Sequence, residues 1–119
     1  MGEFVREVSA REWDEEVLGS EVPVLVDFWA EWCAPCRAVS PIAEELAKEK
    51  VGEMKVLKLN ADENPQVTAG YGVRSIPTLV LFSGGVERGR VVGALPKPRL
   101  EAEVEKALAS ARDAIAREG

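Results

Sequence analysis

The sequence has few of the residues that build metal sites or disulfide scaffolds, since it contains two cysteines and no histidine. A structural zinc ion takes four ligands, so a single chain of this composition is not expected to hold one. Small secreted domains that depend on disulfides usually carry more cysteine. The cysteine pair is therefore predicted to be reactive rather than structural, which is the usual role of such a pair in the cytoplasm.

Long apolar runs and basic runs are also missing. The apolar stretch from Val22 to Ala30 contains Asp27 and is too short to span a bilayer. The first seven residues lack the apolar segment of a signal peptide. The net charge of −6, with no run of Lys or Arg, argues against nucleic acid as a partner. We expect a cytoplasmic protein with neither a membrane nor a nucleic-acid partner.

The residues that are present predict one α/β domain. The chain has 119 residues, of which 46% are hydrophobic and 30% charged, enough to bury a core. Apolar patterning and turn signals predict strands at 5–8, 22–29, 54–60, 78–82 and 86–92. Helices are predicted at 9–18, 38–50, from 64 to about 70, and from 98 almost to the end. This order implies a mixed sheet, with parallel crossovers first and an antiparallel hairpin at one side.

The motif Trp32-Cys33-Ala34-Pro35-Cys36 falls between a buried strand and a helix. Cys33 is thereby placed near a helix N-terminus, where free amides and the helix dipole favour a thiolate. Cys36 lies one turn further on the same face, within reach of a disulfide. We predict that Cys33 is the exposed thiol with a lowered pKa, which attacks a target disulfide, and that Cys36 resolves the mixed disulfide. Two unrelated buried thiols, or half of a metal site shared with a second chain, are the alternatives.

Three further residues each have two interpretations. Asp27, in the middle of an apolar strand, is either a buried proton carrier with a raised pKa or a carboxylate that faces solvent. Lys58 either lies near Asp27 or extends its charge to solvent. Pro77 either begins a strand or forms a cis turn that presents backbone to a substrate.

The segment Val26 to Cys36 closely resembles the active-site segment of the thioredoxin family, in its bacterial form. Further matches follow in the same register over about residues 4–108: Lys58-Leu59-Asn60, Asp62, Asn64-Pro65, Tyr71-Gly72-Val73-Arg74, Ile76-Pro77-Thr78-Leu79 and Val92-Gly93-Ala94-Leu95. The resemblance implies a thioredoxin fold, in which a five-stranded mixed β-sheet is flanked by four helices. Residues 1–108 would form the domain, and residues 109–119 a C-terminal helical extension of it.

The resemblance also implies roles for individual residues. It makes the chain a general protein-disulfide reductase, with Cys33 as nucleophile and Cys36 as resolving thiol. Asp27 would be the acid/base for Cys36, tuned by Lys58, and Pro77 would be cis and face the dithiol. The substrate-binding surface would comprise Trp32, Ala34, Pro35, Ile76, Gly93 and Ala94, together with Pro77.

The partners implied are disulfide-containing proteins and a flavin-containing thioredoxin reductase that draws electrons from NADPH. The chain itself is expected to be a monomer without a bound cofactor. Ala34 departs from the glycine usual in the family, and this puts the redox potential in doubt. The alternatives are a binding module without activity, a disulfide-forming oxidant or isomerase, and a dimer that holds a metal between two motifs.

Overall fold

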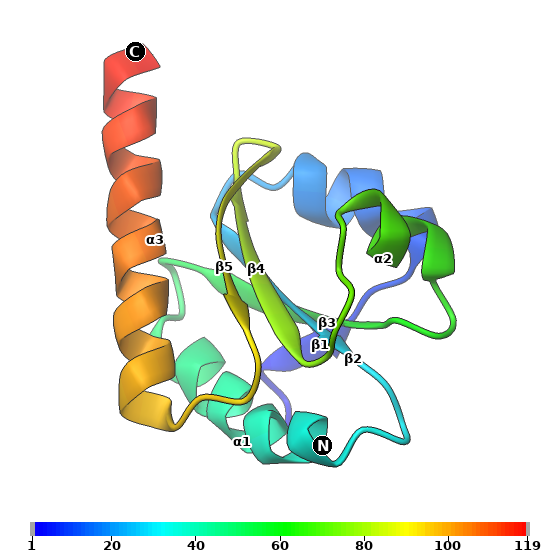
Figure 1. Cartoon of the computed structure of the whole chain (residues 1–119). Coiled ribbons are helices and arrows are strands. Elements are labelled where there is room, and N and C mark those ends of the chain that lie inside the picture. Colours follow the sequence, from blue (N-terminus) through cyan, green and yellow to red (C-terminus); the bar gives the residue numbers. More distant parts are fainter. Residues whose placement is uncertain (1, 119) are drawn as a thin grey trace.

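The computed structural model describes residues 2–118 and contains a five-stranded mixed sheet (Figure 1). The strands are β1 (Val5–Glu7), β2 (Val24–Trp29), β3 (Lys55–Asn60), β4 (Thr78–Ser83) and β5 (Val86–Val92). They lie in the order β1-β3-β2-β4-β5. β3 runs parallel to both β1 and β2, whereas β4 pairs antiparallel with β2 and β5. The predicted mixed sheet is confirmed.

Helices cover both faces of the sheet. They are α1 (Ala34–Glu49), α2 (Pro65–Gly70) and α3 (Lys97–Glu118), preceded by a 3-10 turn, η1 (Ala10–Glu12), and a π-helical segment, η2 (Asp14–Leu18). With η1 and η2 counted together, four helices flank the sheet in the described part of the chain, as predicted. Figure 1 shows α1 and α3 on one face, with α2 and the η segments on the other.

Strand β2 lies at the centre of the sheet, and this explains its continuous apolar sequence. Side chains alternate between the two faces of a strand. Val26 and Phe28 accordingly join the core under the η segments and α2, whereas Leu25 joins the core under α1 and α3. The same alternation places Asp27 on the face that α1 covers.

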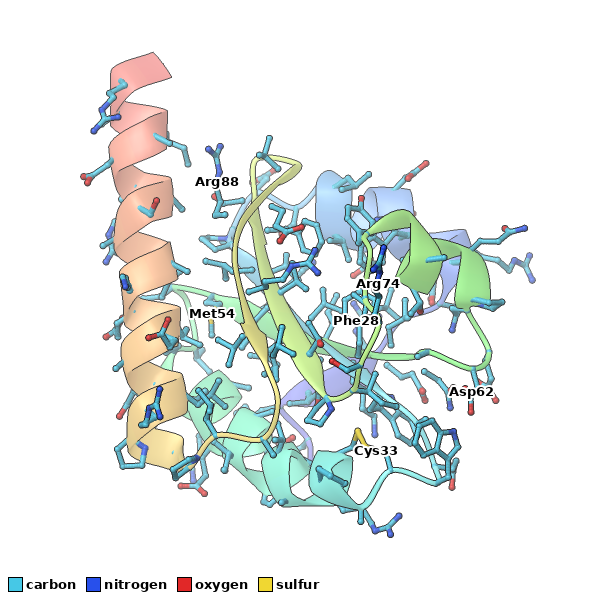
Figure 2. The ribbon with its side chains drawn as sticks, in the orientation of Figure 1. Phe28, Cys33, Met54, Asp62, Arg74 and Arg88 are labelled. Carbon is cyan, nitrogen blue, oxygen red and sulfur yellow. A yellow bond between two sulfur atoms is a disulfide. The ribbon has the colours of Figure 1, made fainter. Side chains whose placement is uncertain are left out.

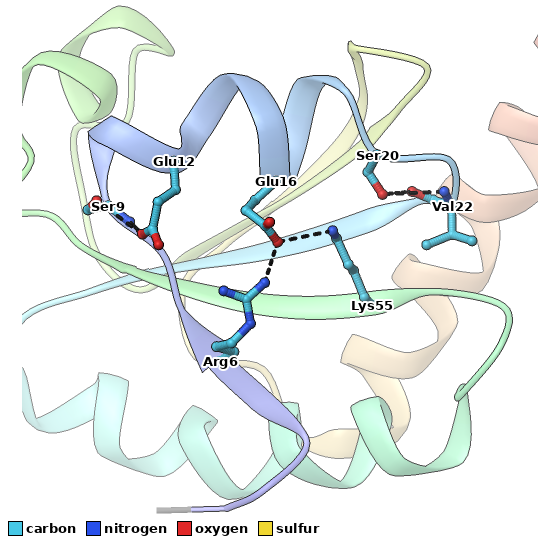
Figure 3. A network of polar contacts seen from close by, with 7 residues as sticks. All are labelled: Arg6, Ser9, Glu12, Glu16, Ser20, Val22 and Lys55. Atoms are coloured by element: carbon cyan, nitrogen blue, oxygen red, sulfur yellow. Dashed lines mark hydrogen bonds and ion pairs between the residues drawn. The ribbon is translucent and has the colours of Figure 1, made fainter.

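The predicted helix at 9–18 is wrong in its geometry. A capping box begins this segment, and the Glu12 carboxylate accepts hydrogen bonds from the backbone N–H and the hydroxyl of Ser9 (Figure 3). Instead of one α-helix, however, a 3-10 turn and a π segment meet at Trp13. Trp13 is buried against Phe28, Tyr71 and Phe82. We attribute the irregular winding to this aromatic packing, which outweighs local helix preference.

An ion-pair cluster attaches η2 to the neighbouring strands. The Glu16 carboxylate contacts the Arg6 guanidinium on β1 and lies 3.5 Å from Lys55 Nζ on β3 (Figure 3). The hydrogen bond from Arg6, with the positive charges of Arg6 and Lys55, holds the pKa of Glu16 below its usual value.

The two glycines of the β4–β5 turn satisfy a backbone requirement. Gly84 and Gly85 adopt φ values of 64° and 78°. Two successive positive φ values match the turn that joins antiparallel strands most tightly, and a side chain would disfavour them. The predicted hairpin is confirmed, with β4 one residue longer than expected.

Helix α3, predicted from residue 98, carries an apolar face of which only part is covered. Leu100, Val104, Leu108 and Ala111 are buried, whereas Ile115 is 48% exposed. The last turns of α3 project beyond the sheet in Figure 1. The helix continues without a break past residue 108, and the predicted domain limits at residues 1 and 119 lie outside the described residues. None of the described helices is long and apolar enough to cross a membrane.

Candidate active site

The two cysteines lie where β2 leads into α1. Cys33 is the N-cap of α1 and Pro35 lies in its first turn, a position that tolerates the missing N–H of proline. Cys33 and Cys36 form a disulfide, with their Cα atoms 5.3 Å apart. The backbone N–H of Cys36 donates a hydrogen bond to Cys33 Sγ at 3.2 Å. Figure 2 shows this sulfur bond at the start of α1.

The expected difference in exposure between the two sulfurs is wrong for this oxidised form. Cys33 is 2% exposed and Cys36 is 3% exposed. Both pack with Ala30, and Trp29 and Ile76 lie against this cluster. The two sulfurs differ instead in their neighbours. Cys33 Sγ lies 3.7 Å from the carbonyl oxygen of Ile76, whereas Cys36 lines a pocket on another side.

That pocket contains Asp27. Its volume is about 150 Å³, and it is lined by Asp27, Trp29, Ala30, Glu31, Cys36, Arg37, Ser40 and Lys58. Asp27 is only 3% exposed, and its Oδ1 has no hydrogen-bond partner within residues 2–118. Burial raises the pKa of Asp27 to about 7, against an opposing effect of the Lys58 charge. Of the two interpretations of Asp27, the structure supports the buried carboxyl.

Lys58 lies directly beside Asp27 in the sheet. The two residues are register partners on the parallel strands β3 and β2. The ammonium of Lys58 lies 4.9 Å from the ring centroid of Trp29, within cation–π range. Lys58 is half-buried and lines the Asp27 pocket. The structure therefore places this charge where it can influence the carboxyl group.

Pro77 follows Ile76, the residue whose carbonyl oxygen approaches Cys33. The Ile76–Pro77 peptide bond is cis. The backbone N–H of Gly93 donates to the carbonyl oxygen of Pro77 at 2.8 Å. This bond joins the segment after β5 to the segment before β4, next to the Ile76 carbonyl that approaches Cys33. Ala94 follows Gly93 and is exposed.

Trp32 stands at the surface beside the dithiol and is 68% exposed. Its indole N–H donates to Asp62 Oδ2 at 2.8 Å, and Figure 2 shows Asp62 on the loop after β3. Trp32, Asp62, Arg74 and Ile76 line one open groove. Ala34 and Pro35 are exposed at the adjoining first turn of α1. The surface next to the dithiol therefore combines exposed apolar groups with the charges of Asp62 and Arg74.

Comparison with known proteins agrees with this geometry. The family model described as Thioredoxin matches residues 4–106. The chain belongs to the thioredoxin family. It is 54% identical over 102 residues to "Thioredoxin 1" of the cyanobacterium Nostoc sp., which covers 86% of this chain and 95% of the relative.

Two further relatives agree with this assignment. Thioredoxin of Synechocystis sp. is 53% identical with the same coverage of both chains. "Thioredoxin M-type, chloroplastic" of Pisum sativum is 54% identical over 86% of this chain, and the match spans 59% of the pea protein. As a thioredoxin, the chain is a protein-disulfide oxidoreductase whose active site is the C-x-x-C pair Cys33 and Cys36.

Within this thioredoxin site, sequence reasoning did not assign roles to Asp62, Arg74 or Ser40. Asp62 follows β3, which is parallel to β2, and the carboxyl ends of parallel neighbours meet at one edge of a sheet. That rule could have placed Asp62 near Trp32. No comparable signal existed for Arg74, which reaches the groove from an irregular loop. The sequence also gave no signal for Ser40, which has the pattern of an exposed helical serine. Only the packing of α1 on the sheet shows that it lines the Asp27 pocket.

Proposed function

We propose that Cys33 is the nucleophile of this thioredoxin and Cys36 the resolving thiol. The Cys33 thiolate attacks one sulfur of a target disulfide, forming a Cys33–target bond and releasing the other target sulfur as a thiolate. Cys36 then loses its proton and attacks Cys33 Sγ. The Cys33–Cys36 disulfide forms, the second target sulfur leaves, and two electrons have passed to the target.

The observation that carries this assignment is the hydrogen bond from the Cys36 amide to Cys33 Sγ. An N–H donor at a helix N-terminus favours negative charge on the sulfur that accepts it. Cys36, which begins the second step, lies instead beside the pocket of Asp27. A carboxylate there disfavours a second negative charge, but it can accept a proton. The two sulfurs thus differ in the way that the two steps require.

Asp27 is the proposed acid/base for Cys36, and Lys58 tunes it. A pKa near 7 suits a group that must both accept and release a proton at neutral pH. The Lys58 charge opposes the effect of burial on the pKa of Asp27, and so favours the ionised carboxylate that can accept a proton.

The proposed substrate-binding surface comprises Trp32, Ala34, Pro35, Ile76, Gly93 and Ala94. Pro77 is buried, and it contributes through the cis peptide bond that it forms with Ile76. Trp32 offers a large exposed ring held by Asp62, of the kind that dominates protein interfaces. A target chain bound along Ile76 would meet the backbone beside Cys33.

Family membership implies target disulfide proteins and a reductase. We propose that this reductase is a flavin-containing thioredoxin reductase that uses NADPH, with the thioredoxin itself acting as a monomer without a bound cofactor. A reducing compartment such as the cytoplasm suits this chemistry.

The test is reduction of insulin by the whole chain, with dithiothreitol and then with NADPH and a purified thioredoxin reductase as electron sources. Cys33→Ser should abolish the activity. Cys36→Ser should accumulate a covalent complex with the target, since attack survives and resolution does not.

The matched variants separate the roles. If Cys33→Ser traps target and Cys36→Ser does not, the nucleophile is Cys36 and the assignment is wrong. If dithiothreitol supports reduction of insulin but NADPH with the flavin reductase does not, the proposed electron source is wrong while the dithiol chemistry stands.

A further inference from the structure

Strand β5 contains an irregularity that changes the direction of its side chains. Its register with β4 passes from Gly89 directly to Glu87, so Arg88 is an extra residue on β5. In a regular strand the side chains alternate between the two faces, and residues three positions apart point to opposite faces. An extra residue removes that offset. Glu87 and Arg90 therefore point to the same face of the sheet.

That face is the one that α2 covers. Arg90 is the register partner of Val80 on β4, and Glu87 is the partner of Phe82. Both partners belong to the core under the η segments and α2, and directly paired residues of neighbouring strands share a face. The Glu87 carboxylate accepts hydrogen bonds from Arg90 Nε at 2.7 Å and from Arg90 Nη2 at 2.8 Å. This contact at two points fixes the plane of the guanidinium group.

The guanidinium group of Arg90 also contacts the end of α2. Its Nη2 donates to the carbonyl oxygen of Tyr71 at 2.6 Å, and Tyr71 is the C-cap of α2. The last carbonyl groups of a helix have no partners within the helix, and a positive charge beside them is favourable. The ring of Tyr71 is held separately, because it packs on Phe82 and its hydroxyl accepts from Trp13 Nε1 at 3.2 Å. Arg90 therefore fixes the backbone where the chain leaves α2.

The loop that leaves α2 forms one wall of the open groove beside the dithiol. Residues 73–76 line that groove, and the carbonyl oxygen of Ile76 lies 3.7 Å from Cys33 Sγ. The far end of the loop is held by Thr78, whose hydroxyl donates to the carbonyl oxygen of Ser75 at 2.6 Å. The near end, at the C-cap of α2, is the end that β5 holds.

We propose that Arg90, oriented by Glu87, is a positioning residue that sets this wall, residues 73–76, for the binding of protein disulfides. The proposal rests on the nucleophile and the substrate-binding surface given above. Arg90 does not line the groove, so it acts on a bound target only through the loop. A protein target extends along the wall, whereas a small disulfide needs only the sulfur of Cys33. Arg90 should therefore matter for protein disulfides and not for small ones.

The test compares three substitutions on β5 in the full chain. Arg90→Met keeps a long unbranched side chain but donates no hydrogen bond. Arg90→Lys keeps the charge and a donor but loses the planar, two-point contact. Arg88→Met is the matched control, because Arg88 Nε donates instead to the carbonyl oxygen of Ser83 at 3.1 Å. Figure 2 shows Arg88 near the β4–β5 turn, away from Cys33.

Each reduced chain is mixed rapidly with excess insulin or excess glutathione disulfide, and its oxidation is followed by tryptophan fluorescence. Arg90→Met should lower the second-order rate constant with insulin by about threefold or more, because a displaced wall positions the target poorly. Its rate constant with glutathione disulfide should not change. Amide hydrogen exchange over residues 71–76, measured by mass spectrometry, should become faster. Arg90→Lys should recover part of the insulin rate, and Arg88→Met should match the parent chain throughout.

Three results would overturn the role of Arg90. They are an equal fall of both rate constants in Arg90→Met, an unchanged rate with insulin, and faster exchange of the loop without a slower reaction with insulin. Trp32→Ala separates this failure from failure of the substrate-binding surface. If Trp32→Ala slows the reaction with insulin and Arg90→Met does not, the surface stands and only the role of Arg90 is wrong. If Trp32→Ala leaves that reaction unchanged, the surface is wrong and this proposal fails with it.

Discussion

At the scale of single residues, Asp27 shows how an active site and a stable core make opposite demands. A carboxyl group at the centre of the sheet is costly to ionise. Hydrophobic residues fill the neighbouring positions of β2, yet this one carries a group whose pKa is raised from 3.8 to about 7. The chain thus retains a destabilising residue at the position where a proton carrier can reach Cys36.

Asp27→Asn should be more stable than the parent chain at neutral pH. Below pH 3.8 the carboxyl group is protonated in both folded and unfolded chains, and burial then carries no ionisation cost. As pH rises towards 7, the unfolded chain loses its proton first and the folded state loses up to roughly 4 kcal/mol. An amide avoids this pH-dependent loss. Urea unfolding at pH 3.5 and pH 7.5 checks the prediction.

The same variant should resolve mixed disulfides more slowly, most clearly near pH 7, where little Cys36 is a thiolate. A variant that is less stable than the parent at pH 7.5, with an unchanged resolution rate, would show that Asp27 is an ordinary carboxylate. The conservative Asp27→Glu variant serves as a control, because it keeps the carboxyl group but places it one methylene further from the backbone.

Reduced Cys33 should be alkylated faster than Cys36 at neutral pH, although the two are equally buried in the disulfide form. The Cys36 amide stabilises a thiolate on Cys33, whereas the Asp27 carboxylate lies on the Cys36 side. Brief treatment with iodoacetamide followed by peptide mass spectrometry measures both rates. Equal labelling, or preference for Cys36, would contradict the assignment of the nucleophile.

At the scale of secondary-structure elements, β5 and α3 approach unusually closely at one position. A Cβ placed on Gly89 of β5 would lie 2.9 Å from the Cβ of Ala107 on α3. Real Cβ atoms essentially never come so close, and the obstacle is the short side chain of a helix rather than a flexible end. A small residue on each element therefore permits α3 to cover this face of the sheet.

Gly89→Ala should destabilise the protein by about 1–3 kcal/mol, as overpacking commonly does. Gly70→Ala is the matched control, because nothing lies within 4 Å of a Cβ there and its φ is not positive. It should be neutral or slightly stabilising. Urea midpoints of the two variants compare them directly. Equal midpoints for Gly89→Ala and the parent would show that α3 moves aside at no cost.

At the scale of the whole molecule, α3 extends away from the active site. The family model matches residues 4–106, and the helix continues to Glu118. In the shared view of Figures 1 and 2, its C-terminal turns lie at the opposite end of the molecule from Cys33. Ala111 is the last fully covered residue of the apolar face.

Two C-terminal truncations should therefore lower the free energy of unfolding by different amounts. Removal of residues 113–119 should change the free energy of unfolding by only about 0.5 kcal/mol, because the removed side chains with described positions are at least partly exposed. Removal of residues 109–119 also takes Ala111 and uncovers Leu108, which should cost about 2 kcal/mol. Denaturant unfolding measures both effects.

Insulin reduction should be unchanged in both shortened chains once they are folded. A loss of activity in the chain that lacks only 113–119, with stability intact, would show that the end of α3 takes part in catalysis or in binding a partner.

The sequence by itself predicted the features that depend on local order. Strand and helix types follow from apolar periodicity, and the position of Cys33 at a helix start follows from the strand–motif–helix order. The hairpin follows from Gly84-Gly85. The burial of Asp27 was one of two interpretations. The sequence pattern of a lone carboxylate in an apolar strand is the same whether the strand is central or at an edge of the sheet.

Only the tertiary structure decided how distant segments meet. It placed β2 at the centre of the sheet, which buries Asp27, and packed Trp13 so that the first helix winds irregularly. It buried Cys33 by bringing Ile76 against it, and it brought Ser40 of α1 to the pocket that contains Asp27. These outcomes depend on contacts between residues of different secondary-structure elements or loops. Local periodicity carries no information on such contacts, because each segment has the same pattern whichever neighbour covers it.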